Sequence, residues 1–139
     1  MSEALLGVDL GSARIGIAIC EGAELPAMPL ATIRHLDWAR DIEAILGLAA
    51  ERGARRIVVG NPIGMDGRAG PASAKAAAFA AQLKERFEGE VVLHDERFTT
   101  AIASKRLRDL PLSGSKRRRH VDELAAVEIL TAYLNGRRA

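Results

Sequence analysis

The chain has 139 residues, of which 48% are apolar and 27% are charged. This length suits one compact domain and excludes a two-lobed protein. The longest uncharged stretches span nine residues, whereas a membrane-crossing helix needs ~20 apolar residues. Cys20 is the only cysteine, which excludes an internal disulfide and a multi-cysteine metal site.

The first half of the chain predicts a hairpin that begins a sheet. Two short runs rich in β-branched residues, 5–10 and 15–20, flank a Gly-Ser-Ala-Arg turn, which is typical of two antiparallel strands. A weak third strand follows at 30–33, and apolar residues at helical spacing predict a helix over 37–52. A continuous apolar run within 56–60 indicates a buried parallel strand.

The second half predicts helices on either side of one more strand. A glycine-rich loop over 61–70 leads to an alanine-rich helix over 71–87 with a proline at its first position. The segments that follow are a strand over 90–94, a helix over 101–110, a mobile loop over 111–119 and a last helix over 121–134 that ends at Asn135-Gly136. This order predicts one α/β domain over residues 1–139, with right-handed βαβ crossovers.

The net charge of +2 hides an uneven distribution. Residues 97–119 contain eight basic residues and one acid, a local charge of +7, and the rest of the chain carries −5. A basic block on an acidic body favours a polyanion as partner. The alternative is a solvated loop that binds nothing.

Asp9 ends the first predicted strand, between Val8 and Leu10. If this strand is central, both of its faces are covered, and a carboxylate there is costly unless it meets a metal or a phosphate. Glycines at positions 7, 11 and 16 leave room for a ligand to approach the backbone. The alternative is a plain Asp-Gly turn.

Asp95 and Glu96 follow the strand over 90–94, so acids again mark the carboxyl end of a strand. Open α/β sheets bind ligands in the crevice at those ends. Adjacent strand residues point to opposite faces, and the sequence leaves open which of the two acids points inward. The alternative role for both is capping of the helix that follows.

Asp122 is the third acid of interest, because in a helix it shares a face with Ala126 and Ile129. A carboxylate in the first helical turn is also explained by the helix dipole. These are the only acids that the sequence places at strand ends or on an inward helix stripe. Three such carboxylates suit hard divalent cations.

Four ordered motifs carry a resemblance to a known family. They are LGVDLGSARIG over 6–16, VVGNPIGMDG over 58–67, DERFTT over 95–100, and DELAA over 122–126 followed by Ile129 and Leu130. Together they resemble the successive signatures of the YqgF family, also called RuvX, which is associated with pre-16S rRNA nucleases and Holliday-junction resolvases. Asn61 and Gly64 depart from the usual pattern, in which leucine and asparagine are typical, and this departure leaves substrate details open.

The resemblance implies a ribonuclease-H-like fold, with a mixed five-stranded sheet that is antiparallel in its first three strands, then parallel, and flanked by helices. It also implies that Asp9, Glu96 and Asp122 are the catalytic, metal-binding carboxylates, with Asp95 as a rival to Glu96. Mg²⁺ or Mn²⁺ is the implied cofactor. The implied function is hydrolysis of phosphodiester bonds in 5′-end maturation of pre-16S ribosomal RNA.

Two divalent ions about 3.5–4 Å apart would activate water and stabilise the leaving oxygen. Arg14 and Arg97 are candidates for contacts to flanking phosphates, and ion pairing with the same acids is the alternative. Salt-sensitive affinity for nucleic acid is expected from Lys116, Arg117, Arg118 and Arg119. His120 is either a proton donor to the leaving group or an ordinary surface histidine.

Other functions remain open at this point. The first hairpin also resembles the phosphate-binding turn of two-lobed actin-like and sugar-kinase ATPases, but this chain has material for one lobe. A Holliday-junction resolvase acting on branched DNA would need a symmetric dimer, and the sequence leaves monomer and homodimer open. A non-catalytic RNA- or ribosome-binding protein would use the acids only as caps. Because the N-terminus lacks a secretory pattern, a cytoplasmic location is expected.

Overall fold

The computed structural model describes residues 3–22, 24–62, 70–96 and 115–138, with the backbone alone over 115–121 and at 138. Its elements, in chain order, are β1 (Ala4–Leu10), β2 (Arg14–Cys20), β3 (Met28–Arg34), α1 (Trp38–Arg52), β4 (Ala54–Asn61), α2 (Pro71–Arg86), β5 (Glu90–Asp95) and α4 (Ser115–Arg138). The predicted helix over 101–110 and most of the predicted loop over 61–70 lie outside the described residues.

The strands form one mixed sheet in the order β3-β2-β1-β4-β5. β1 and β3 pair with β2 in antiparallel fashion, whereas β4 runs parallel to both β1 and β5. This arrangement confirms the predicted sheet. β1 is the central strand, and its residues from Ala4 to Asp9 are buried, so Asp9 ends a strand that is covered on both faces.

α1 shows how local sequence sets the element boundaries. The Asp37 side chain accepts a hydrogen bond of 2.9 Å from the Arg40 amide, which caps the first turn. At the other end, Gly53 adopts φ of 67° in the left-handed region, a conformation that favours glycine after the last helical turn. The predicted helix over 37–52 is therefore confirmed, with Asp37 as its cap.

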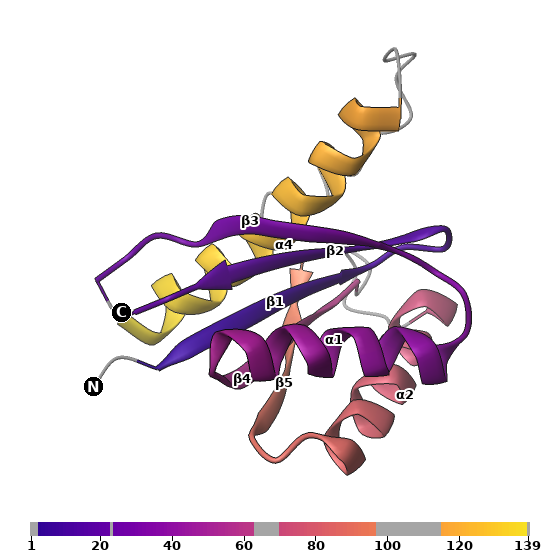
Figure 1. Cartoon of the computed structure of the whole chain (residues 1–139), viewed down its shortest axis with the longest axis horizontal. Helices are drawn as coiled ribbons and strands as arrows, with labels where there is room; N and C mark the ends of the chain where they lie inside the picture. Colours follow the sequence, from indigo (N-terminus) through magenta and orange to yellow (C-terminus); the bar gives the residue numbers. More distant parts are fainter. Residues whose placement is uncertain (1–2, 23, 63–69, 97–114, 139) are drawn as a thin grey trace.

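Helices cover both faces of the sheet (Figure 1). The core beneath α1 and α2 includes Leu6, Val8, Ile57, Val59 and Phe79. The core beneath α4 includes Leu5, Ala18, Val58, Ala126, Ile129 and Leu130. Because side chains alternate along a strand, Asp9 lies on the same face as Leu5 and points toward α4. None of the described helices is both long and apolar enough to span a membrane.

α4 is longer than the sequence predicts at both ends. It begins at Ser115, so the expectation of a loop was wrong for 115–119. Lysine and arginine are good helix formers, and the basic run extends the helix toward its N-terminus. α4 also continues through Gly136, since a glycine costs only about 1 kcal/mol inside a helix. In Figure 1 the first turns of α4 project beyond the sheet.

Glycines on three strands let α4 lie very close to the sheet. A Cβ atom at Gly7 would stand 2.9 Å from Leu130 Cβ, and one at Gly16 would stand 2.0 Å from the backbone oxygen of Asp122. A Cβ at Gly60 would stand 2.6 Å from Ile129 Cδ1. The glycines at 7 and 16, which the sequence suggested as space for a ligand, instead make room for a helix.

Gly16→Ala is expected to destabilise the fold by about 1–3 kcal/mol or more, because the new methyl group meets the backbone of α4 rather than a movable side-chain end. Gly47→Ala in α1 is the matched control. A Cβ there has nothing within 4 Å, so this change should raise the free energy of unfolding by about 0.5–1 kcal/mol. Urea denaturation measures both variants. A Gly16→Ala protein as stable as the wild type would contradict this close contact.

Candidate active site

Asp9 and Asp122 are brought together by the pairing of β1 with β2. Asp9 is 1% exposed and lies opposite Gly16 in the antiparallel register. Residues directly opposite each other place their side chains on the same face of the sheet. Because the missing side chain of Gly16 is replaced by the backbone of Asp122, α4 carries Asp122, also 1% exposed, over the strand beside Asp9.

Glu96, the residue directly after β5, reaches the same face. A Cβ at Gly60 would stand 3.1 Å from Glu96 Cδ and 3.3 Å from its Cγ, so the Glu96 side chain lies over the end of β4. Gly60 shares its face with Val58, which packs beneath α4. Glu96 is 1% exposed. Three buried carboxylates from distant parts of the chain thus lie on the α4 face, at the carboxyl ends of β1 and β5 and at the α4 helix.

Asp95 lies on the other face. It pairs with Asn61 in the parallel register, and along the pleat it alternates with His94, whose ring contacts Tyr133 of α4 at a centroid distance of 6.1 Å. Of the two adjacent acids that the sequence left open, the structure therefore brings Glu96, and not Asp95, to the side of Asp9. Burial lowers the pKa of His94, and the negative charge of Asp95 partly offsets this effect.

Arg14 contacts the site directly. Its Nε donates to Asp122 Oδ2 at 2.6 Å, and the side chains of Arg14 and Asp122 are 29% and 1% exposed. The sequence left ion pairing and phosphate contact open for Arg14, and the described structure contains the ion pair. One positive charge at hydrogen-bond distance offsets part of the cost of burying the Asp122 carboxylate.

Carboxylates are the oxygen ligands that hard cations such as Mg²⁺ prefer, so the donor chemistry of the three acids fits a divalent metal. Their arrangement is a different matter. Within residues 3–22, 24–62, 70–96 and 115–138, no three acidic, histidine or cysteine side chains are placed so that they could hold one metal ion together. The acids lie on one face of the sheet, near the carboxyl ends of β1 and β5, without forming a complete coordination site.

The other predicted site residues are only partly placed. Arg97 lies outside the described residues, and Lys116, Arg117, Arg118, Arg119 and His120 are described by their helical backbone alone. They occupy the first turns of α4, directly before Asp122. The basic run is therefore helical and adjoins the acid site along the chain.

Sequence reasoning missed a fourth buried acid, Asp41, which is 1% exposed. It accepts a hydrogen bond from the Leu36 amide at 3.1 Å and pairs with His35 Nδ1, so it is held by the segment that precedes α1. The sequence around Asp41, four residues after the cap Asp37, does not indicate that this acid is buried, because its partners come from the segment before the helix. It lies away from the α4 face and does not join the site.

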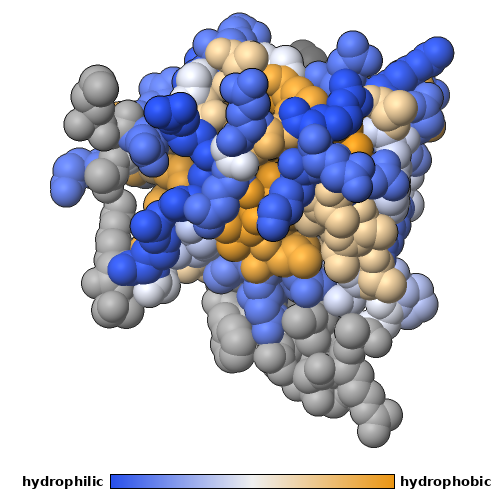
Figure 2. All heavy atoms as spheres, turned by 90° about the horizontal axis from the view of Figure 1, so that it is seen from below, coloured by the Kyte–Doolittle hydropathy of each residue, from blue (hydrophilic) through white to orange (hydrophobic). Residues whose placement is uncertain are grey.

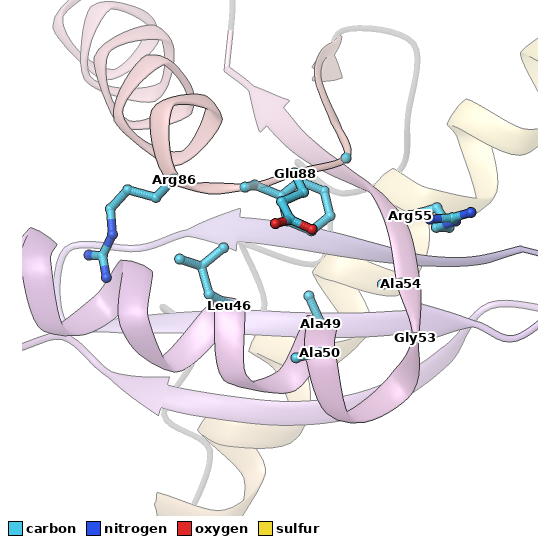
Figure 3. A pocket seen from close by; sticks show the side chains of 10 residues that line it. Leu46, Ala49, Ala50, Gly53, Ala54, Arg55, Arg86 and Glu88 are labelled. Atoms are coloured by element: carbon cyan, nitrogen blue, oxygen red, sulfur yellow. The ribbon is translucent and has the colours of Figure 1, made fainter.

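A cavity of about 570 Å³ lies at the other end of the sheet. Figure 3 shows Leu46, Ala49 and Ala50 of α1 along one side, with Arg55 and Arg86 farther out. The face seen from below carries apolar surface framed by hydrophilic residues (Figure 2). Since this cavity adjoins the first residue of β4 and the turn before β5, it is remote from the acids at the carboxyl ends.

Comparison with solved structures shows the fold. Thermus thermophilus RuvC in complex with a Holliday junction substrate matches with a TM-score of 0.60 at 16% identity, covering 98% of this chain and 96% of that chain. The fowlpox virus Holliday junction resolvase matches with a TM-score of 0.52, also at 16% identity, covering 96% and 99%. These likenesses confirm the predicted ribonuclease-H-like fold.

Comparison with sequences shows the family. A protein of Clostridium perfringens, described as a candidate pre-16S rRNA nuclease, is 34% identical over 131 residues, which cover 94% of this chain and 96% of the relative. A protein of Chloroflexus aggregans with the same description is 40% identical over 136 residues, covering 98% and 96%. The family model described as "RuvX: Holliday junction resolvase" matches residues 3–136. The chain therefore belongs to the RuvX family, as its four motifs predict.

Proposed function

We propose that this protein is a divalent-metal-dependent nuclease that hydrolyses phosphodiester bonds in the 5′-end maturation of pre-16S rRNA in the cytoplasm. The observation that carries the proposal is the convergence of Asp9, Glu96 and Asp122, all 1% exposed, on one face at one edge of the sheet. Burying three carboxylates on one face of the sheet is costly, so this arrangement favours a site that takes up cations. The names of the relatives supply the substrate.

Asp9, Glu96 and Asp122 are the residues that would hold Mg²⁺ or Mn²⁺. A divalent ion bound there would make water a better nucleophile and stabilise negative charge on phosphate oxygens. The chain's own part is to fix the three carboxylates on separate elements that pack rigidly together, since β1 is buried on both faces and α4 touches the backbone at Gly16.

Basic residues would hold the rest of the nucleic acid. Arg14 lies at the site itself, and Arg97 follows Glu96 directly in the sequence. The run of Lys116, Arg117, Arg118 and Arg119 is carried by the first turns of α4, which project beyond the sheet (Figure 1). Such contacts to phosphates position a strand without reading its sequence.

A Holliday-junction resolvase is the second candidate, because the family model carries that description and the fold matches a RuvC seen with a junction. Symmetric cutting of a junction needs two active sites, hence a homodimer, whereas RNA trimming needs one site and is compatible with a monomer. A four-way DNA junction tested beside precursor rRNA separates the two activities. Binding of either substrate without cleavage would favour a non-catalytic role.

Asp9→Asn, Glu96→Gln and Asp122→Asn are each expected to slow cleavage of pre-16S rRNA by at least about 100-fold, because each removes a charge from a site that contributes several kcal/mol of transition-state stabilisation. Rates are measured in Mg²⁺, and EDTA should abolish cleavage by the wild type. Asp95→Asn is the matched control. It removes the same charge one residue away on the opposite face and should leave the rate within about twofold.

Two results would contradict this assignment. If Asp95→Asn lost activity and Glu96→Gln kept it, the choice between the adjacent acids would be wrong. If wild type and Asp9→Asn cut alike, the cleavage would come from a contaminant or from another site.

Replacing Lys116, Arg117, Arg118 and Arg119 together by glutamine is expected to weaken RNA binding and to flatten its dependence on salt. The slope of log Kd against log salt should fall by up to about 3, since each lost phosphate contact removes about 0.7–0.9. The control replaces Arg55 and Arg86, which line the distant cavity, and should leave the slope unchanged. An unaltered slope in the four-residue variant would mean that the basic run does not contact nucleic acid.

A further inference from the structure

The ion pair between Arg14 and Asp122 differs from the other arginine pairs of the described structure. Arg14 Nε lies 2.6 Å from a carboxylate that is 1% exposed. For comparison, the pairs Arg40–Asp37, Arg52–Glu21 and Arg56–Glu90 span 3.2–3.6 Å, and their carboxylates are 55–59% exposed. Exposed pairs contribute little to stability, whereas breaking a pair with a buried partner is costly. The Arg14 pair is therefore the strong one.

Backbone contacts place both partners of this pair. The Gly11 amide donates to the Arg14 carbonyl oxygen at 2.9 Å and closes the hairpin turn, and the His35 amide donates to the Ala13 carbonyl oxygen at 3.0 Å. Arg14 thus starts β2 from a turn that is anchored to the neighbouring chain segment. Asp122 is held over the same strand by the close approach of α4 at Gly16. The backbones of both residues are therefore fixed where their side chains can pair.

The Arg14–Asp122 pair explains why the three acids have ligand chemistry for a divalent cation but are not arranged to bind one. The three acids suit a divalent cation, yet the described residues contain no three ligands arranged to hold one. Asp122 Oδ2 is held by a guanidinium at 2.6 Å. A guanidinium and a divalent ion on one carboxylate repel each other, and in a buried site this repulsion is poorly screened.

We propose that Arg14 and a divalent cation are alternative partners of Asp122. Without metal, the ion pair with Arg14 helps to stabilise the buried Asp122 carboxylate. When a divalent ion binds, its charge replaces that of Arg14, and the released guanidinium, whose side chain is already 29% exposed, becomes available to a phosphate, to which arginine binds in a bidentate manner. This inference rests on the proposed metal-dependent nuclease and adds a competition that couples metal binding to nucleic-acid binding.

The test is Mn²⁺ binding by isothermal titration calorimetry in the absence of nucleic acid. Arg14→Gln keeps an amide donor and removes the charge. It should bind Mn²⁺ at least about tenfold more tightly than the wild type, because a competing positive charge is gone. Arg14→Lys keeps the charge and should stay close to the wild type. If Arg14 served only to orient Asp122 for the metal, Arg14→Gln would bind Mn²⁺ more weakly, and equal or weaker binding overturns the proposal.

Arg34→Gln is the matched control for loss of a nearby charge. Arg34 is the partner of Arg14 in the β2–β3 register and is exposed, so its effect on Mn²⁺ affinity should be below about twofold, because solvent screens exposed charges. A change as large as that of Arg14→Gln would make the effect one of general charge and overturn the specific competition.

Thermal unfolding gives a second readout. Arg14→Gln should lower the Tm in EDTA, since the buried Asp122 carboxylate loses its ion pair with Arg14, and saturating Mn²⁺ should remove most of that difference. If the variant is unfolded without metal, Mn²⁺ should restore its circular dichroism spectrum, and failure to do so overturns the proposal.

These outcomes are separate from the fate of the nuclease proposal. Equal Mn²⁺ affinities, with cleavage lost in Asp9→Asn, would leave the nuclease standing and remove the role of Arg14. If Arg14→Gln binds Mn²⁺ more tightly but the protein cleaves neither RNA nor a DNA junction, the competition between Arg14 and metal stands and the nuclease proposal fails.

Discussion

The close approach of α4 to the sheet is the constraint on which the rest of the structure depends. It is possible only because strands β1, β2 and β4 present glycines at positions 7, 16 and 60, where a Cβ would meet α4 or its side chains at 2.0–2.9 Å. The same approach carries Asp122 to Asp9 and seats Ile129 beside Glu96. The contact between α4 and the sheet therefore sets both the packing and the positions of the acids. A methyl group at one of these glycines would disturb both.

The three buried acids between α4 and the sheet carry an electrostatic cost. Three carboxylates at 1% exposure would oppose folding if nothing offset their charge, and Arg14 supplies one positive charge by pairing with Asp122 at 2.6 Å. A divalent cation bound as we propose would supply more positive charge. Its binding would then replace the Arg14 charge and would link the stability of the fold to metal binding.

Local patterns were enough to predict the individual strands, the hairpin and α1, because alternation, turn residues and caps act over a few positions, whereas the form of the mixed sheet came from the family resemblance. The choice between Asp95 and Glu96 needed the register of β5, which no local pattern contains. Asp41 went unnoticed because its partners precede the helix. The prediction of a loop over 115–119 was wrong. It gave too much weight to the proline, glycine and serine residues of the predicted loop over 111–119 and too little to the helix-forming tendency of the basic run.

We propose that Asp9 of β1, Glu96 directly after β5 and Asp122 of α4 form one cation site from which Arg14 is displaced. Anomalous X-ray diffraction from crystals soaked in Mn²⁺ tests it most directly. We expect a Mn²⁺ peak in contact with Asp9, Glu96 and Asp122, with the Arg14 guanidinium moved away from Asp122 Oδ2. A Mn²⁺ peak elsewhere, or a Mn²⁺ ion on these acids beside an intact Arg14–Asp122 pair, would contradict it.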